Sequence, residues 1–248
     1  MSESFADRLD AHRRSEHRIG RIEEYLKQIV YGGNDGIVTT FAVVAGFAGA
    51  GHGGAAVVGG LAVLLFGLAN LFADATAMGL GEFLSSRSER DVYNATRARE
   101  RVEIERNPEF ERAEAVEILA QKGVPPEDAA ALADLMMRNP DFMADFMMQH
   151  EVGMADPEGS SPAARGAMTF GSFVLFGSAP LWPYFVLPPE PETFPVSLAM
   201  TFAALVALGL LRWKVTTETM ARCVGETVLV GGTCAAVAYA VGLAFRLA

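Results

Sequence analysis

The chain has 248 residues, of which 51% are hydrophobic, and its formal net charge is −10. The acidic excess would repel phosphate groups and therefore excludes a nucleic-acid partner. Charged residues are concentrated in residues 1–27 and 87–165, whereas the remaining sequence is almost free of charge. This distribution is typical of a membrane protein whose spans are separated by polar segments.

Five apolar segments each reach or nearly reach the roughly 20 residues that a helix needs to cross a bilayer. The first is the least apolar, because Asn34 and Asp35 interrupt it. We therefore predict an all-α membrane protein with five transmembrane helices, at about residues 29–50, 55–84, 167–187, 194–211 and 224–245.

The distribution of Lys and Arg predicts the orientation of these spans, because positive charge favours the cytosolic side. Six lie in residues 1–27 and ten in residues 87–165, but none in the loops 51–54 and 188–195. The N-terminus and the central segment are thus predicted to be cytosolic and the C-terminus to lie outside. Arg outnumbers Lys by 17 to 3 and Ala is abundant, which favours a bacterial source and an inner (cytoplasmic) membrane.

The central segment between the second and third spans predicts a cytosolic helical domain. Residues 97–105 continue the second span as a helix, which ends at Asn107-Pro108 because Pro lacks a backbone N–H. Further helices are expected at about residues 108–122, 126–138 and 140–151. The predicted organisation is a cytosolic arm at 1–28, two spans at 29–86, the helical domain at 87–164 and three spans at 165–248.

Four glutamates of this domain have spacings that place them on one helical face. They are Glu100, Glu103, Glu111 and Glu114. Carboxylates spaced i, i+3 repel each other unless a cation lies between them, so the face is a candidate metal site. A solvated acidic face, whose charge is partly neutralised by neighbouring arginines, would explain the same spacing.

A second candidate ligand set lies at the end of the same domain. Met147 and Met148 are followed by Glu151, which is three residues after Met148. Thioethers beside a carboxylate disfavour Mg²⁺ and Ca²⁺ and suit a transition metal. The alternative is a methionine stripe that packs into the core of the domain.

The spans contain candidate ligands as well. Asp35 lies in the first span, and Asp74, Met78 and Glu82 follow one another at four-residue intervals on one face of the second. An ionisable group inside a membrane is costly, so we interpret this face as a cation path. In the alternative, Asp35 and Glu82 lie at the membrane interface and Asp74 is paired with a polar neighbour.

Several stretches of the sequence resemble the vacuolar iron transporters and their yeast calcium-sensitivity-complementing and nodulin-like relatives. They are GNDGIVTTFAVVAG at residues 33–46, GLANL at 67–71, MGLGEFLS at 78–85, GET at 225–227, GG at 231–232 and Ala238-Tyr239. The resemblance covers the chain from about residue 29 to residue 242.

This resemblance implies a homodimer that exchanges Fe²⁺ for protons and moves the metal out of the cytosol. By position, Asp35 and Met78 match the membrane site of the family. The cytosolic metal ligands of the family match Glu100, Glu103, Glu111, Glu114, Met147, Met148 and Glu151. Gln28 and Asn70 stand where eukaryotic members have acidic residues, which leaves the coupling to protons open.

We therefore predict a transporter of Fe²⁺ or a related ion such as Mn²⁺, Co²⁺ or Zn²⁺, with no permanently bound cofactor. Its partners would be the metal ion, protons, the lipid bilayer and a second copy of the chain. We predict no enzymatic activity, because the sequence contains no nucleophile with a base and no phosphate loop. The alternatives are a membrane metal sensor or buffer, or a channel, without coupled transport.

Overall fold

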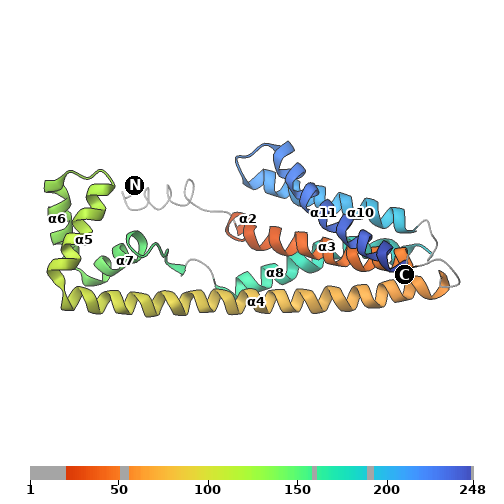
Figure 1. Ribbon diagram of the computed structural model, residues 1–248, viewed down its shortest axis with the longest axis horizontal. Coiled ribbons are helices and arrows are strands. Elements are labelled where there is room, and N and C mark those ends of the chain that lie inside the picture. The colour runs from red at the N-terminus through yellow and green to blue at the C-terminus, as the bar shows by residue number, and fades with distance from the viewer. Residues whose placement is uncertain (1–20, 51–55, 158–160, 189–192, 247–248) are drawn as a thin grey trace, which may run out of the picture. The chain divides into compact units, whose positions relative to one another are not determined.

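The computed structural model describes residues 21–50, 56–157, 161–188 and 193–246, and the regular structure in these ranges is helical (Figure 1). The chain divides into two compact units, Met1–Phe83 with Ala163–Ala248, and Leu84–Pro162. Helix α4 (Ala56–Arg106) contributes to both units. The prediction that the second span continues as a helix into the polar segment is therefore confirmed.

The first unit is built around α3 (Leu26–Ala50), which packs against α10 (Thr193–Val215) and α11 (Met220–Arg246). Ile37 of α3 is buried in a cluster with Leu205 and Leu208 of α10. The unit also contains the N-terminal part of α4, α2 (Arg21–Glu24), α8 (Pro162–Gly177), η2 (Ala179–Leu181) and α9 (Trp182–Val186).

Glycines bring α3 and α8 close together in the first unit. A Cβ atom at Gly32 would lie 2.6 Å from the carbonyl oxygen of Thr169, and one at Gly36 would collide with the carbonyl oxygen of Phe173. Both positions therefore need a residue without a side chain. Because Asp35 lies between these glycines, the helix contact also fixes the part of α3 that carries this carboxylate.

Three described helical stretches are long and apolar enough to cross a membrane: Gly60–Arg106, Thr193–Val215 and Met220–Ala238. The chain is thus a multi-pass membrane protein. They correspond to the predicted second, fourth and fifth spans. The described parts of the predicted first and third spans are not among these three stretches. In α3 the polar pair Asn34 and Asp35 lowers the mean hydropathy, and α8 has only 16 residues.

The predicted third span, residues 167–187, is not one continuous helix. It is divided among α8, η2 and α9. Pro180 and Pro183 lack the N–H that an unbroken helix would use at these positions. The buried Ser197 of α10 donates a hydrogen bond of 2.7 Å to the carbonyl oxygen of Pro180, which satisfies one backbone acceptor at the break.

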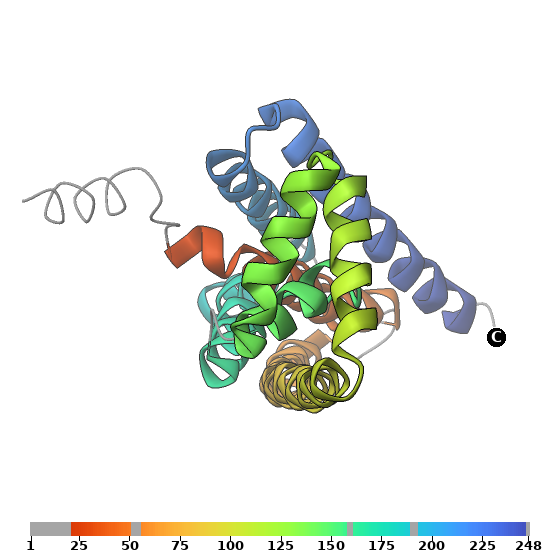
Figure 2. The same cartoon turned by 90° about the vertical axis from the view of Figure 1, so that its left-hand side faces the viewer.

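The second unit contains the C-terminal part of α4 and three short helices, α5 (Pro108–Gln121), α6 (Pro126–Met137) and α7 (Pro140–His150). Each begins at a proline, as predicted, because the first helical N–H has no partner within a helix. α5 and α6 lie side by side in both views (Figures 1 and 2). Ala115, Ala133 and Met143 are fully buried in the core of this unit, beside Ile104 of α4.

The close approach of α3 and α8 generates a first prediction. Gly36→Ala should lower the melting temperature of the full-length protein in detergent, because its methyl group would push against the backbone of α8, a cost of about 1–3 kcal/mol. Gly171→Ala in α8 is the control, since a Cβ there has no atom within 4 Å. The control should be neutral or stabilising, because Ala favours helix over Gly. Equal melting temperatures for the two variants would contradict the close contact.

Candidate functional site

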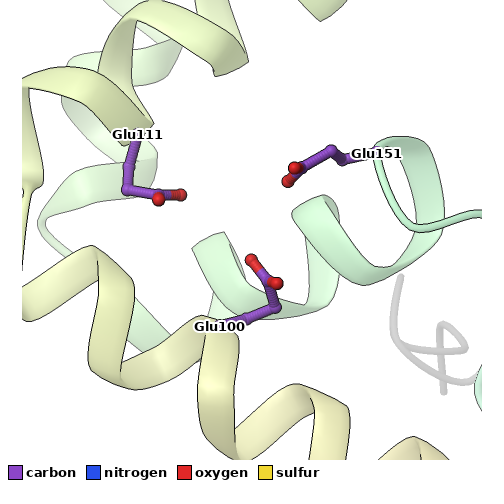
Figure 3. A group of neighbouring side chains, drawn as sticks. All are labelled: Glu100, Glu111 and Glu151. Atoms are coloured by element: carbon purple, nitrogen blue, oxygen red, sulfur yellow. The ribbon is translucent and has the colours of Figure 1, made fainter.

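Three glutamates from different elements meet in the second unit. Glu100 comes from α4, Glu111 from the first turn of α5 and Glu151 from the residue that follows α7. One carboxylate oxygen from each lies within 4.8 Å of the other two, and the three side chains point toward a common centre (Figure 3). We call these three residues the carboxylate cluster.

A single-residue joint explains how two of these side chains meet. α4 ends at Arg106, α5 begins at Pro108, and only Asn107 lies between them. The Asn107 side-chain amide donates a hydrogen bond to the Glu103 carboxylate at 3.0 Å. The backbone carbonyl oxygen of Asn107 accepts a hydrogen bond from the backbone N–H of Glu111 at 3.1 Å. The short joint brings the end of α4 and the start of α5 together, which places Glu100 beside Glu111.

Glu111 is the most perturbed member of the cluster. Its side chain is buried, with 6% of the residue exposed, and its Oε2 atom accepts no hydrogen bond among the described residues. Burial and then the charges of Glu114, Glu100, Glu151 and Glu103 raise the pKa of Glu111 to about 7. A buried carboxylate without a donor among other carboxylates is unfavourable alone, and a bound cation would offset both penalties.

The other acidic side chains surround the cluster. The pKa of Glu151 is raised by burial and by the charges of Glu100 and Glu114. Glu103 and Glu114 are half-buried, and both contribute to the field that raises the pKa of Glu111. The four predicted glutamates therefore do not share one helix, since two lie on α4 and two on α5. Their charges nevertheless act together on Glu111, as does that of Glu151, which follows α7.

Met147 and Met148 are fully buried. Met147 belongs to the apolar core of the second unit, together with Met143. This burial agrees with the core-stripe alternative, since a methionine can pack without contacting a metal. Their role as metal ligands remains a prediction.

The first unit places the predicted membrane carboxylates among amides. The Asn70 side-chain amide donates to Asp74 at 2.9 Å, and the buried Gln28 donates to Glu82 at 2.8 Å. Asp35 lies near enough to Asp74 for the two carboxylates to repel each other. Glu82 is thus hydrogen-bonded to α3, and Asp74 has the polar neighbour of the alternative interpretation.

Met78 and the groove between α3 and α4 complete this region. Met78 is half-buried and packs against the apolar cluster that contains Leu71, Ala75 and Phe173. An open groove of about 680 Å³ runs between α3 and α4 and is apolar apart from Asn70. Asn70 therefore connects the groove to the Asp74 carboxylate.

Sequence reasoning missed one of these contacts. Gln28 and Glu82 are 54 positions apart and only the packing of α3 against α4 brings them together. The Asn70–Asp74 hydrogen bond has i, i+4 spacing and gives Asp74 the polar neighbour that the sequence-based alternative expected.

Comparison with known proteins gives a consistent result over nearly the whole chain. The VIT family matches residues 26–243. Vacuolar iron transporter 1 of Tulipa gesneriana is 34% identical over 224 residues, which are 90% of this chain and 88% of that protein. Vacuolar iron transporter 1 of Arabidopsis thaliana is 34% identical over 93% of this chain and 89% of its own length. The vacuolar iron transporter of Toxoplasma gondii is 34% identical over 94% of this chain and 78% of its own length.

The raised pKa of Glu111 generates a second prediction. A carboxyl group whose pKa is higher in the folded state stabilises the fold at low pH, and this stability is lost as pH rises through about 7. With metal removed by a chelator, the melting temperature of the wild type should fall from about pH 4.5, the ordinary pKa of a glutamate, to about pH 7 and level off above it. Glu111→Gln should flatten this fall, because the amide does not ionise.

Glu117→Gln is the matched control for this measurement, because Glu117 lies on the same helix but is exposed and accepts a hydrogen bond from Gln121. It should keep the wild-type pH dependence. A Glu111→Gln profile parallel to that of the wild type would contradict the assignment of the buried proton to Glu111.

Proposed function

Because the chain belongs to the VIT family, we propose that it transports Fe²⁺ out of the cytosol in exchange for protons, with Mn²⁺, Co²⁺ and Zn²⁺ as competing substrates. The observation that carries this proposal is the carboxylate cluster with its buried, unpartnered Glu111 oxygen. The relatives, which are named vacuolar iron transporters, support the choice of metal.

The second unit is proposed to gather the metal. Carboxylate oxygens bind Fe²⁺ and Mn²⁺, and a thioether donor shifts preference away from Mg²⁺ and Ca²⁺. The ligands in this proposal are Glu100, Glu103, Glu111, Glu114, Met147, Met148 and Glu151. Since a proton and a metal ion compete for the same oxygens, binding should strengthen as pH rises through the pKa of Glu111.

The first unit is proposed to carry the metal across the membrane. Asp35 and Met78 would bind the metal, and Asp74 and Glu82 would be further binding positions along the path. Either a cation or a proton would relieve the repulsion between Asp35 and Asp74. A bound metal ion could therefore be replaced by a proton, and a proton by a metal ion, during transport. Asp74 and Glu82 already accept hydrogen bonds from amides. Asp35 has no such amide partner among the described contacts, so we assign the main exchange to it.

The orientation of the transporter in its membrane is proposed from the distribution of Lys and Arg. The N-terminus and the second unit face the cytosol, the C-terminus faces the other side, and five helices span a bacterial inner membrane. The chain works as a homodimer, and the apolar groove between α3 and α4 is the face that a second copy would cover. Asn70 in this groove would bring the membrane carboxylates near the interface.

Transport by Asp35 variants generates the third prediction. The purified protein is reconstituted in vesicles with its second unit outward, and Fe²⁺ uptake is measured with and without a proton gradient. Asp35→Asn should abolish uptake, because the amide can exchange neither a proton nor a metal. Its melting temperature should stay equal or rise, because an ionised Asp in a span is unfavourable by about 2.5–3.5 kcal/mol.

Tyr31→Phe, one turn earlier on α3 and exposed, should transport at the wild-type rate. Wild-type uptake by Asp35→Asn would refute the membrane site. Saturable metal binding without flux would instead indicate a sensor or buffer, and flux that ignores the proton gradient would indicate a channel.

Met78 generates the fourth prediction, which concerns selectivity. Met78→Ala should increase the inhibition of Fe²⁺ uptake by Mg²⁺, because it removes a donor that favours softer ions. The pH dependence should stay unchanged, since a thioether does not ionise. Unaltered Mg²⁺ competition would mean that Met78 only packs against its apolar neighbours.

A further inference from the structure

Two arginines of α4 meet two aspartates of α7 in the second unit. Arg97 Nε lies 2.5 Å from Asp145 Oδ1, and Arg101 Nη1 lies 2.5 Å from Asp141 Oδ1. Arg97 Nη2 also donates to the backbone carbonyl oxygen of Asp141 at 3.3 Å. The arginines are four residues apart and so are the aspartates, so the two pairs form one matched row between the helices.

The same two helices carry two members of the carboxylate cluster. Glu100 lies between Arg97 and Arg101 in α4, and Glu151 directly follows the last residue of α7. Any movement of α7 along or around α4 would therefore move Glu151 relative to Glu100. The ion pairs lie on the part of α7 that precedes Glu151.

The apolar contacts of α7 hold it against the core of the unit. Met143, Ala144 and Met147 are buried there, but apolar attraction is non-directional, so charge pairs add a constraint on the register that burial alone does not supply. A shift of one residue moves a helical position by about 1.5 Å and rotates it by about 100°. Such a shift would weaken the whole row, in which Arg97 Nη2 also lies 3.6 Å from Asp141 Oδ1, because the arginines and aspartates would no longer face one another.

We propose that the Arg97–Asp145 and Arg101–Asp141 ion pairs set the register of α7 on α4 and thereby hold Glu151 in the carboxylate cluster. The four residues are positioning residues, because they act through Glu151. The affinity of the cluster for metal in this account rests on the proposed function, whereas the register of α7 does not.

The decisive variant is Arg97→Gln/Arg101→Gln in the full-length protein, with Mn²⁺ as the probe and free Mn²⁺ measured by electron paramagnetic resonance. Removing two positive charges would strengthen cation binding if only the electrostatic field mattered. Loss of register predicts the opposite, a weakening of Mn²⁺ binding by about fivefold, the size expected for an exposed ion-pair row. Binding that is unchanged or tighter would overturn the link between the ion pairs and the cluster.

Arg112→Gln is the matched control. Arg112 pairs with Asp134 of α6 at 2.5 Å, and its side chain is 39% exposed, against 30% for Arg97 and 34% for Arg101. This pair does not involve α7, so the control should bind Mn²⁺ at least as tightly as the wild type. Arg97→Lys/Arg101→Lys should restore most of the affinity, and an equal loss in the control would overturn the proposal.

A second measurement tests the register without metal. Nitroxide labels on cysteines at the exposed positions Asn94 of α4 and Gln149 of α7, with Cys223 and Cys234 replaced by Ser, report the distance between the helices. The distance distribution should be narrow in the wild type and shifted or broadened in the Arg→Gln variant. An unchanged distribution would overturn the proposal.

The two accounts fail in different ways. If Glu111→Gln and Glu151→Gln bind Mn²⁺ as the wild type does, the metal site itself is wrong, while the label distances still decide the register of α7. If the label distances change but Mn²⁺ affinity does not, the ion pairs set the register without serving the cluster, and the proposal is overturned.

Discussion

Repulsion between carboxylates is the constraint on which this structure depends. The second unit places Glu100, Glu111 and Glu151 within 4.8 Å of one another, with Glu111 almost fully buried. In the first unit Asp35 and Asp74 are both half-buried and lie near enough for their charges to interact. Neither arrangement is favourable for an empty, fully ionised protein, so each needs a proton or a cation. In the proposed function this need would connect the two units chemically, because a proton and a metal ion would compete for the same carboxylate oxygens in each.

The surrounding fold holds these unfavourable groups in place. In the second unit the single-residue joint at Asn107 turns the chain so that Glu111 faces Glu100, and apolar packing around Met143 and Ala133 secures the short helices. In the first unit, glycines at 32 and 36 let α3 approach α8 closely. Amide donors at Gln28 and Asn70 then bond two of the membrane carboxylates without adding charge. Asp35 has no such amide donor among the described contacts, which is why the proposed function assigns the exchange to it.

The sequence was informative where spacing alone determines position. Prolines predicted the starts of α5, α6 and α7, because this effect is local. Helical periodicity selected the four glutamates, but they lie on two helices, α4 and α5, and it is the joint at Asn107 that brings Glu100 beside Glu111. Glu151 joins the cluster across 40 residues from Glu111, and Gln28 reaches Glu82 across 54; spacing cannot predict such contacts, because tertiary packing produces them. The break in the third predicted span was also missed, although Pro180 and Pro183 signalled it, because hydropathy averages over a proline. From the sequence, Met147 and Met148 could be either metal ligands or core residues. Their burial depends on how α7 packs, which spacing does not determine.

The most direct test of the central claim is to locate the metal. Crystals of the full-length protein grown with Mn²⁺ can be measured with X-rays on either side of the manganese absorption edge, so that anomalous difference density marks the ion. We expect a peak at the centre of Glu100, Glu111 and Glu151, which disappears in crystals of Glu111→Gln. Anomalous density at other sites with none at this centre, or a peak that persists in Glu111→Gln, would contradict the account.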